Sequence, residues 1–159
     1  MKIPLNIAAW LQENLYLLTL SGYSADLFMC AMPGELNDDV KYRWQFAVDM
    51  IYRGIKSGLM DVWDGANKAR GNIDFSLDLV NQLAKFDPNS DQVCWFGPEI
   101  EATELCGALV KKFDIQSCAH GDVCRSFIEE IEALFDRHGV SWSAAPLIEL
   151  ESGASRAEH

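Results

Sequence analysis

The amino-acid sequence predicts a mostly α-helical fold, with five or six helices around a central buried helix and at most a small two- or three-stranded β element. Apolar residues recur at helical spacing in several long segments, whereas the runs typical of strands are short. The chain has 159 residues, of which 49% are hydrophobic, and this content suffices for a single hydrophobic core. We therefore expect one globular domain over residues 1–150, followed by a flexible polar tail over residues 151–159.

The N-terminal segment is expected to form a core helix with Pro4 in its first turn. Its apolar run is interrupted by Gln12, Glu13 and Asn14, and no small-residue cleavage pattern follows it. The segment therefore fits neither a signal peptide nor a membrane span, and we expect a cytoplasmic protein.

The central helix is expected over residues 40–55. The N-cap candidates just before it are Asn37, Asp38 and Asp39, and Gly58 would let the chain turn after it. One apolar stripe at helical spacing consists of Val40, Trp44, Ala47, Val48, Ile51 and Ile55. Because Phe46 and Met50 form a second apolar strip, this helix is expected to pack between other helices.

The remaining segments predict three further helices and three short strands. Apolar residues recur at helical spacing over residues 76–86, 98–113 and 123–138. Pro98 would open the second of these helices, with Glu99 and Glu101 in its first turn, and Asp122 would cap the third. Short apolar runs predict strands at residues 93–96 and 140–142 and a strand or an extended turn at residues 59–63. A polar loop is expected at residues 65–75.

The charge of the chain is strongly negative. Lys and Arg total 13 against 24 Asp and Glu, which gives a formal net charge of −11. This balance disfavours nucleic acid and anionic membranes as partners and favours a basic protein. The glycine-rich loops that bind nucleotides and the zinc-deaminase motif do not occur in the sequence. We therefore expect no cofactor, and a monomer or weak homodimer with a protein partner.

The segment CAHGDVC brings Cys118, His120 and Cys124 close together in the sequence. Structural zinc requires four ligands, usually with a C-x-x-C pair, and that pair is absent here. A histidine near a cysteine would favour a reactive thiolate, but no known catalytic signature surrounds these residues. We expect neither a metal site nor a catalytic site, and a small thiol or metal enzyme at these residues is the alternative.

Two groups of acidic residues form the candidate partner-binding surface. The group on the last helix is expected to project into solvent opposite its apolar stripe, and consists of Glu129, Glu132 and Asp136. The group around the central helix and the turn after it consists of Glu35, Asp38, Asp39, Asp61 and Asp64. Trp63 lies between the last two and would act as an aromatic anchor within an acidic rim, with packing in the core as the alternative.

The segment from Val40 to Asp64 resembles immunity proteins of bacterial toxin systems, including contact-dependent growth inhibition. The similarity consists of an aliphatic helix that ends in a glycine before a short apolar run, carried by Ile51, Ile55, Gly58, Leu59, Met60 and Val62. The resemblance implies a catalytically inert cytoplasmic protein that binds one cognate toxin domain and blocks its active site or substrate surface. It assigns no catalytic residues.

The expected function is therefore stoichiometric inhibition of a basic toxin domain. A nuclease toxin carries a basic surface for nucleic acid, and an acidic inhibitor can compete for that surface. A phage-type anti-defence inhibitor would have the same size and charge, and is the main alternative among binding proteins. An oligomeric adaptor is a further alternative, because the five Trp and eight Phe residues could leave apolar surface for self-association.

Overall fold

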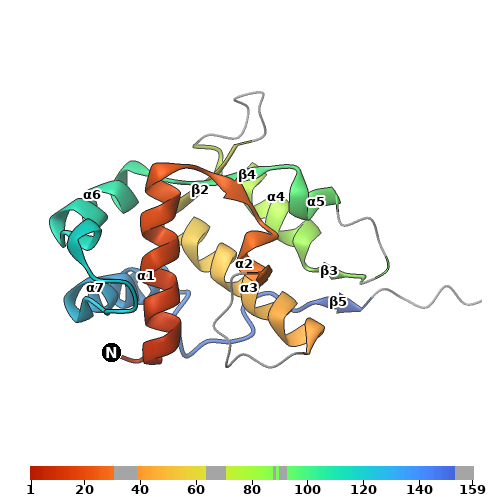
Figure 1. Cartoon of the computed structure of the whole chain (residues 1–159). Coiled ribbons are helices and arrows are strands. Elements are labelled where there is room, and N and C mark those ends of the chain that lie inside the picture. Colours follow the sequence, from red (N-terminus) through yellow and green to blue (C-terminus); the bar gives the residue numbers. More distant parts are fainter. Residues whose placement is uncertain (31–38, 64–70, 88, 90–92, 153–159) are drawn as a thin grey trace, which may run out of the picture.

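The computed structural model describes residues 1–30, 39–63, 71–87, 89 and 93–152. It confirms a mostly helical fold with a small antiparallel sheet (Figure 1). The helices are α1 (Leu5–Leu20), α2 (Leu27–Cys30), α3 (Val40–Lys56), α4 (Ile73–Leu83), α5 (Val93–Phe96), α6 (Glu104–Lys112), the 3-10 turn η1 (Ile115–Ser117) and α7 (Arg125–Arg137). The strands are β1 (Tyr23–Ser24), β2 (Met60–Trp63), β3 (Lys85–Phe86), β4 (Glu99–Ala102) and β5 (Glu151–Ser152).

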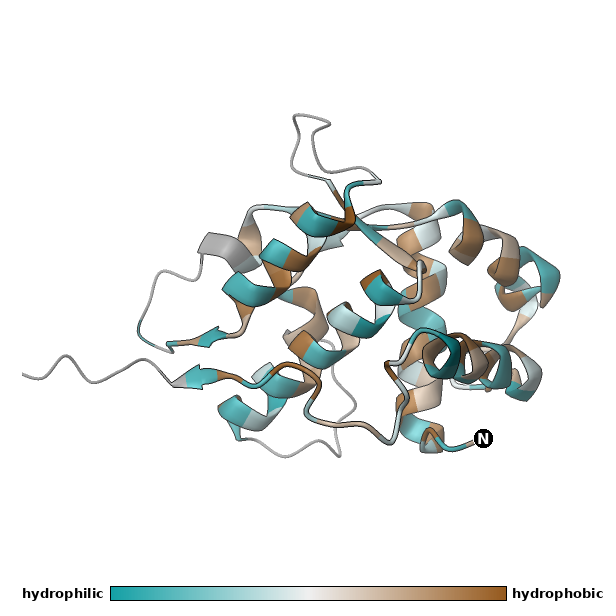
Figure 2. Ribbon diagram, turned by 180° about the vertical axis from the view of Figure 1, so that it is seen from behind, coloured by the Kyte–Doolittle hydropathy of each residue, from teal (hydrophilic) through white to brown (hydrophobic). Residues whose placement is uncertain are grey.

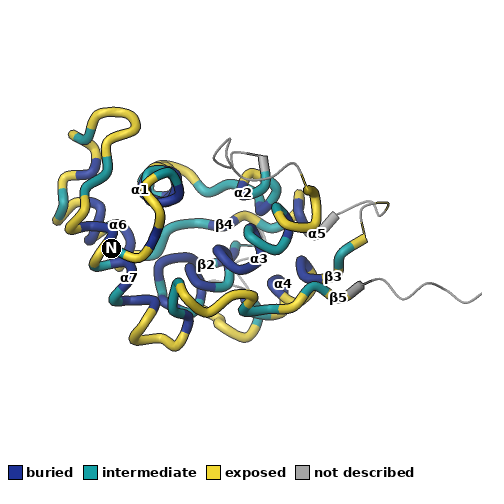
Figure 3. The backbone as a smooth tube through the Cα atoms, turned by 90° about the horizontal axis from the view of Figure 1, so that it is seen from below, coloured by how far each residue is buried: buried dark blue, intermediate teal, exposed yellow. Residues whose placement is uncertain are grey.

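The three-stranded sheet has the order β1-β4-β2, and both pairings are antiparallel. Along the β2–β4 pair, Met60 lies opposite Ala102 at one end and Trp63 lies opposite Glu99 at the other. The sheet lies near the C-terminal end of α1, with α6 and α7 on one side of α1 and α4 and α5 on the other (Figures 1 and 3). A separate parallel pair joins β3 and β5.

The predicted central helix is confirmed as α3, and it is buried over most of its length (Figure 3). Asp39 caps its start by accepting a hydrogen bond from the backbone N–H of Lys41 at 2.9 Å. Gly58, with φ of 76°, allows the chain to turn directly into β2. Trp44 is fully packed, and its Nε1–H donates to the carbonyl of Leu83 at 2.6 Å. The stripe fails only at its first residue, Val40, which is exposed at the helix start.

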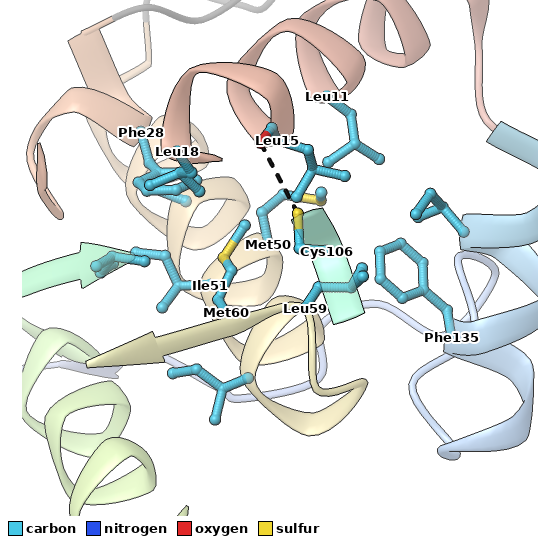
Figure 4. Packing of buried hydrophobic residues seen from close by; sticks show 14 of the residues in the cluster. Leu11, Leu15, Leu18, Phe28, Met50, Ile51, Leu59, Met60, Cys106 and Phe135 are labelled. Carbon is cyan, nitrogen blue, oxygen red and sulfur yellow. Dashed lines mark hydrogen bonds between the residues drawn. The ribbon is translucent and has the colours of Figure 1, made fainter. Parts of the chain in front are cut away.

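The N-terminal helix is also confirmed, with Pro4 one position earlier than expected, at the N-cap of α1. The core that α1 shares with α3, β2, α6 and α7 contains Cys106, whose thiol points to the carbonyl of Leu15 at 3.8 Å (Figure 4). Leu59 and Phe135 approach the same core region from the other side (Figure 4). Helices α3, α4, α6 and α7 carry hydrophobic and hydrophilic residues on different faces, as an amphipathic packing requires (Figure 2).

Two predictions around residue 98 are wrong. Residues 93–96 form the short helix α5 instead of a strand, and residues 99–102 form β4 instead of a first helical turn. The helical turn buries Trp95 completely, with its ring 5.1 Å from that of Trp44. In β4 the pattern Glu-Ile-Glu-Ala alternates with the period of a strand and buries Ile100. The helix begins only after Thr103, whose Oγ1 accepts from the N–H of Cys106.

Two helix starts also differ from the prediction. The helix expected from residue 76 begins at Ile73, inside the predicted polar loop, because Asn72 caps it by accepting from the N–H of Phe75 at 3.2 Å. The last helix begins after Cys124, whereas Asp122 lies in the preceding turn and does not cap it.

The C-terminal segment differs as well. Residues 140–142 do not form the expected strand, because Arg53 satisfies their backbone carbonyls in place of a neighbouring strand. The expected tail begins with Glu151–Ser152, which pair with β3, and residues 153–159 lie outside the described residues. Among the described residues, none of the helices has the length and apolarity needed to cross a bilayer.

Candidate functional site

The predicted central acidic group is divided by the structure. Asp61 and Trp63 lie on β2, whereas Asp39 serves as the N-cap of α3. The other predicted members, Glu35, Asp38 and Asp64, lie outside the described residues. Within the described part, only Asp61 and Trp63 therefore share one surface.

The register of the sheet adds two carboxylates to this surface. Asp61 lies directly opposite Glu101, and Trp63 lies directly opposite Glu99. Residues opposite each other in an antiparallel pair project from the same face, and the residues between them project from the other face. We call the face formed by Asp61, Trp63, Glu99 and Glu101 the acidic sheet face.

The opposite face of the same strands packs against the core. Its members are Met60, Val62, Ile100 and Ala102, of which the first three are buried. This burial fixes the register, because a slip by one residue would place carboxylates in the core and apolar side chains outside. The hydrophobic alternation of the two strands thus presents the acidic sheet face outward.

Hydrogen bonds hold the carboxylate of Asp61 in place. It accepts from the backbone N–H of Val62 and of Gly71, both at 2.8 Å, and from the hydroxyl of Ser76 at 3.4 Å. All three of these donors are neutral, so the bonds orient the carboxylate without adding positive charge. Asp61 therefore connects β2 to the start of α4 and contributes charge to the acidic sheet face.

A hollow of about 350 Å³ adjoins this face between the end of α1 and the start of α6. Its lining includes Glu101 and Glu104, and Leu20, whose side chain is 64% exposed. Glu99, on the acidic sheet face, is also exposed. The acidic sheet face and this hollow together combine apolar contact area with several carboxylates, the combination expected of a surface that docks a basic protein.

The acidic group predicted on the last helix does not form a common solvent-exposed surface, and that prediction is wrong for Glu132. Glu132 is only 8% exposed, and its Oε1 accepts hydrogen bonds from the backbone N–H groups of Lys2 and Ile3. Glu129 and Asp136 are exposed, but both face the N-terminal segment. The N-terminal segment therefore crosses this side of α7 and uses its carboxylates.

Positive groups of the N-terminal segment offset the remaining charge. The amino group of Met1 lies 3.8 Å from Glu129, and Nζ of Lys2 lies 3.1 Å from Asp136. Hydrogen bonding from Ser141, followed by that from Lys2, lowers the pKa of Asp136. These carboxylates therefore help to hold the N-terminal segment against α7.

The CAHGDVC segment forms the turn between η1 and α7. His120 lies 3.5 Å from Glu13 on α1, and the N–H of Cys124 donates to the buried side chain of Gln12 at 2.8 Å. No group of three or more His, Cys, Asp or Glu residues in the described part of the chain is arranged to hold a metal ion.

The electrostatics of this turn do not favour a thiolate. Desolvation, and then the negative charges of Cys124, Asp114 and Asp122, raise the pKa of the Cys118 thiol. A catalytic cysteine requires the opposite shift. The adjoining hollow between α1 and the turn, of about 190 Å³, is lined by Glu13, Cys118 and Asp122 among others.

Two buried charged residues were missed by the sequence reasoning. Asp49 and Arg53 lie one turn apart on α3 and are 4% and 2% exposed. Their signal in the sequence was present, since both are charged residues within an apolar helix that was already expected to be buried. They line a further hollow beside the C-terminal segment.

Comparison of the chain with protein-family models, curated proteins and solved structures finds no match. The function is therefore argued from the geometry and charge of the site itself, because a fold alone does not fix a function.

Proposed function

We propose that this protein is a non-catalytic inhibitor that binds a basic toxin domain through the acidic sheet face and occludes its active site or substrate surface. The observation that carries the proposal is the β2–β4 register, which places Asp61, Glu99 and Glu101 around Trp63 on one face. The net charge of −11 supports the same class of partner.

The proposed docking separates two roles. Trp63 and the exposed Leu20 supply apolar contact area, which gives most of the affinity in protein interfaces. The carboxylates accelerate association with a basic surface and exclude acidic partners. Because a nuclease binds the phosphates of its substrate through basic residues, a partner of this class would have its substrate surface covered.

The competing thiol-enzyme function is not supported by the turn that contains Cys118. The raised pKa of this thiol disfavours the reactive thiolate, and no described cluster is arranged for a metal. A phage-type anti-defence inhibitor would use the same acidic surface, and the identity of the captured partner distinguishes it from an immunity protein.

The test uses two doubly charge-reversed variants. Glu99→Lys/Glu101→Lys changes the acidic sheet face, and the matched control Asp122→Lys/Glu149→Lys changes the net charge equally at two exposed residues on other segments. Tagged wild type and both variants are used to capture partners from the source cell at low and high salt, and the captured domain is then purified and titrated. We expect wild type and the control to bind one basic domain in a salt-dependent manner.

The proposal predicts at least tenfold weaker binding by the sheet-face variant, since several charge contacts would become repulsive. Equal weakening in both variants would assign the effect to net charge alone and overturn the proposed surface. A captured partner that is acidic, or binding that does not depend on salt, would overturn the proposed class of partner.

A further inference from the structure

The hollow beside α3 is lined by two buried charged residues, Asp49 and Arg53, that the proposed inhibitor function does not use. It has a volume of about 310 Å³, which lies in the range of small-molecule sites. Its walls include the aromatic rings of Tyr42, Phe46 and Trp142, and its polar lining includes Asp49 and Arg53. Apolar walls with a few polar groups are typical of ligand pockets.

The carboxylate of Asp49 uses only one of its oxygens for the fold. Its Oδ1 accepts from the backbone N–H groups of Leu147 and Ile148, at 3.0 and 3.2 Å, and from Nε2 of Gln45 at 3.1 Å. Oδ2 accepts no hydrogen bond from the described residues. Asp49 lines the hollow, and its Oδ2 is not among the fully buried side-chain atoms of the described residues that lack a partner, so it has room for a further donor.

The guanidinium of Arg53 likewise uses only some of its nitrogens for hydrogen bonds within the described residues. Its Nε donates to the carbonyl of Val140 at 3.2 Å, and its Nη2 donates to the carbonyls of Ser141, Trp142 and Ala144, the last at 2.6 Å. Nη1 donates to no acceptor within the described residues. The group also lies over the ring of Trp142, at 5.1 Å from its centroid, where a cation is attracted to the aromatic face.

The two side chains lie one helical turn apart and both line the hollow. Asp49 and Arg53 are four residues apart on α3, so their Cβ atoms are about 6 Å apart. No ion pair within 4.0 Å joins them among the described residues, and a ligand can therefore contact both. The hydrogen bonds from Oδ1, Nε and Nη2 already hold residues 140–148 as one wall, so the pocket is formed before a ligand binds.

We infer that this hollow binds a flat, uncharged heterocycle that carries an adjacent N–H and C=O, a lactam edge. Its N–H would donate to Oδ2 of Asp49, and its carbonyl would accept from Nη1 of Arg53. Its ring would contact the aromatic walls. An uncharged occupant fits because the two side chains bring opposite charges to the pocket.

The test compares two probes that differ by one donor. 2-Quinolone has a lactam N–H, whereas N-methyl-2-quinolone has the same ring and carbonyl without it. The full chain is titrated with each probe, and binding is monitored by NMR. Shifts of the amide resonances of Leu147 and Ile148 and of the indole resonance of Trp142 place the bound probe in this hollow. Because the methylated probe loses a hydrogen bond to a charged group, we expect it to bind at least about tenfold more weakly.

Two variants separate the polar edge from the walls. Asp49→Asn can keep the Oδ1 acceptor for Leu147 and Ile148 but places an amide N–H₂ where Oδ2 was, so the preference for the lactam probe is expected to vanish. Tyr42→Ala, at a 48% exposed side chain, removes wall area and is expected to weaken both probes equally.

Equal binding of the two probes by the wild type would overturn the inference, as would a preference that persists in Asp49→Asn. The inference would also be overturned if 2-quinolone, at the highest concentration at which it dissolves, failed to shift the amide resonances of Leu147 and Ile148 and the indole resonance of Trp142. Thermal unfolding of each variant establishes that the comparison is made on folded protein.

Discussion

Glu132 provides the sharpest test of how the N-terminal segment is held. Its carboxylate is 8% exposed and accepts from the N–H groups of Lys2 and Ile3, the second at 2.7 Å. Ile3 is 1% exposed, so its N–H cannot recover a hydrogen bond to water without movement of the chain. Glu132→Ala removes the acceptor for both groups.

The expected magnitude follows from the burial of the two N–H groups. Leaving a buried donor unsatisfied costs about 1–3 kcal/mol, and the half-buried N–H of Lys2 lies at the low end. We therefore expect Glu132→Ala to lower the free energy of unfolding by about 3 kcal/mol. Glu132→Gln keeps an acceptor oxygen and loses only the charge, so the expected loss is about 1 kcal/mol.

Urea unfolding measures these losses, and thermal unfolding checks them. A loss of about 3 kcal/mol corresponds to about 9 °C in Tm for a domain of this size. The matched control is Glu129→Ala on the same helix, where the carboxylate is half-exposed and its amino-group partner lies 3.8 Å away. Its expected loss is under about 0.5 kcal/mol. Equal losses at the two positions, or a loss in Glu132→Gln as large as in Glu132→Ala, would refute the reasoning.

Three further predictions concern other buried positions. Gly54→Ala is expected to lower the free energy of unfolding by about 2 kcal/mol in urea unfolding, because the new Cβ would lie 2.2 Å from Sδ of the buried Met60. The control Gly107→Ala has nothing within 4 Å of its new Cβ and is expected to raise the free energy of unfolding by about 0.5 kcal/mol, so a reversed order would contradict the packing. Burial raises the pKa of the Cys106 thiol to about 12. A thiol-specific disulfide reagent at about pH 8 is therefore expected to modify Cys106 only after unfolding, and equal rates of modification in the folded and unfolded protein would contradict its burial. Desolvation raises the pKa of Asp49 in the folded chain, so the native state binds this proton more tightly than the unfolded chain. The contribution of this proton to stability is present below the ordinary aspartate pKa of about 3.9 and falls as the pH rises through the higher folded pKa. The stability of Asp49→Asn relative to wild type is therefore expected to increase with pH over this range in urea unfolding, and a constant difference would exclude this effect.

The bounds of a helix could be predicted where capping residues and glycines adjacent in the sequence determine them. The start of α3 follows from the capping carboxylate of Asp39, and its end from the positive φ of Gly58. Residues 93–102 were mispredicted because a short apolar run is compatible with both a strand and a buried helical turn. Tertiary packing decided this segment, through the contact of Trp95 with Trp44.

The candidate site depended even more on contacts between distant segments. Glu99 and Glu101 join Asp61 and Trp63 only because β4 pairs with β2. Glu132 was expected in solvent because helical spacing places it off the apolar stripe, yet the N-terminal segment covers it through a bond to Ile3. No spacing rule within one helix reveals such a partner.

The carboxylates on α7 and those on the sheet differ in the chemistry of their bonding partners. On α7, Glu129 and Asp136 face an amino group and an ammonium group, so positive charge cancels part of their field. At the sheet, the described residues that donate to Asp61 supply two peptide N–H groups and a hydroxyl, which orient the carboxylate without adding positive charge. A carboxylate that is already held in place costs less entropy to use in an interface than a free one. The acidic sheet face is therefore the surface on which a basic partner would find both charge and preorganisation, and the charge reversal at Glu99 and Glu101 should precede any change on α7.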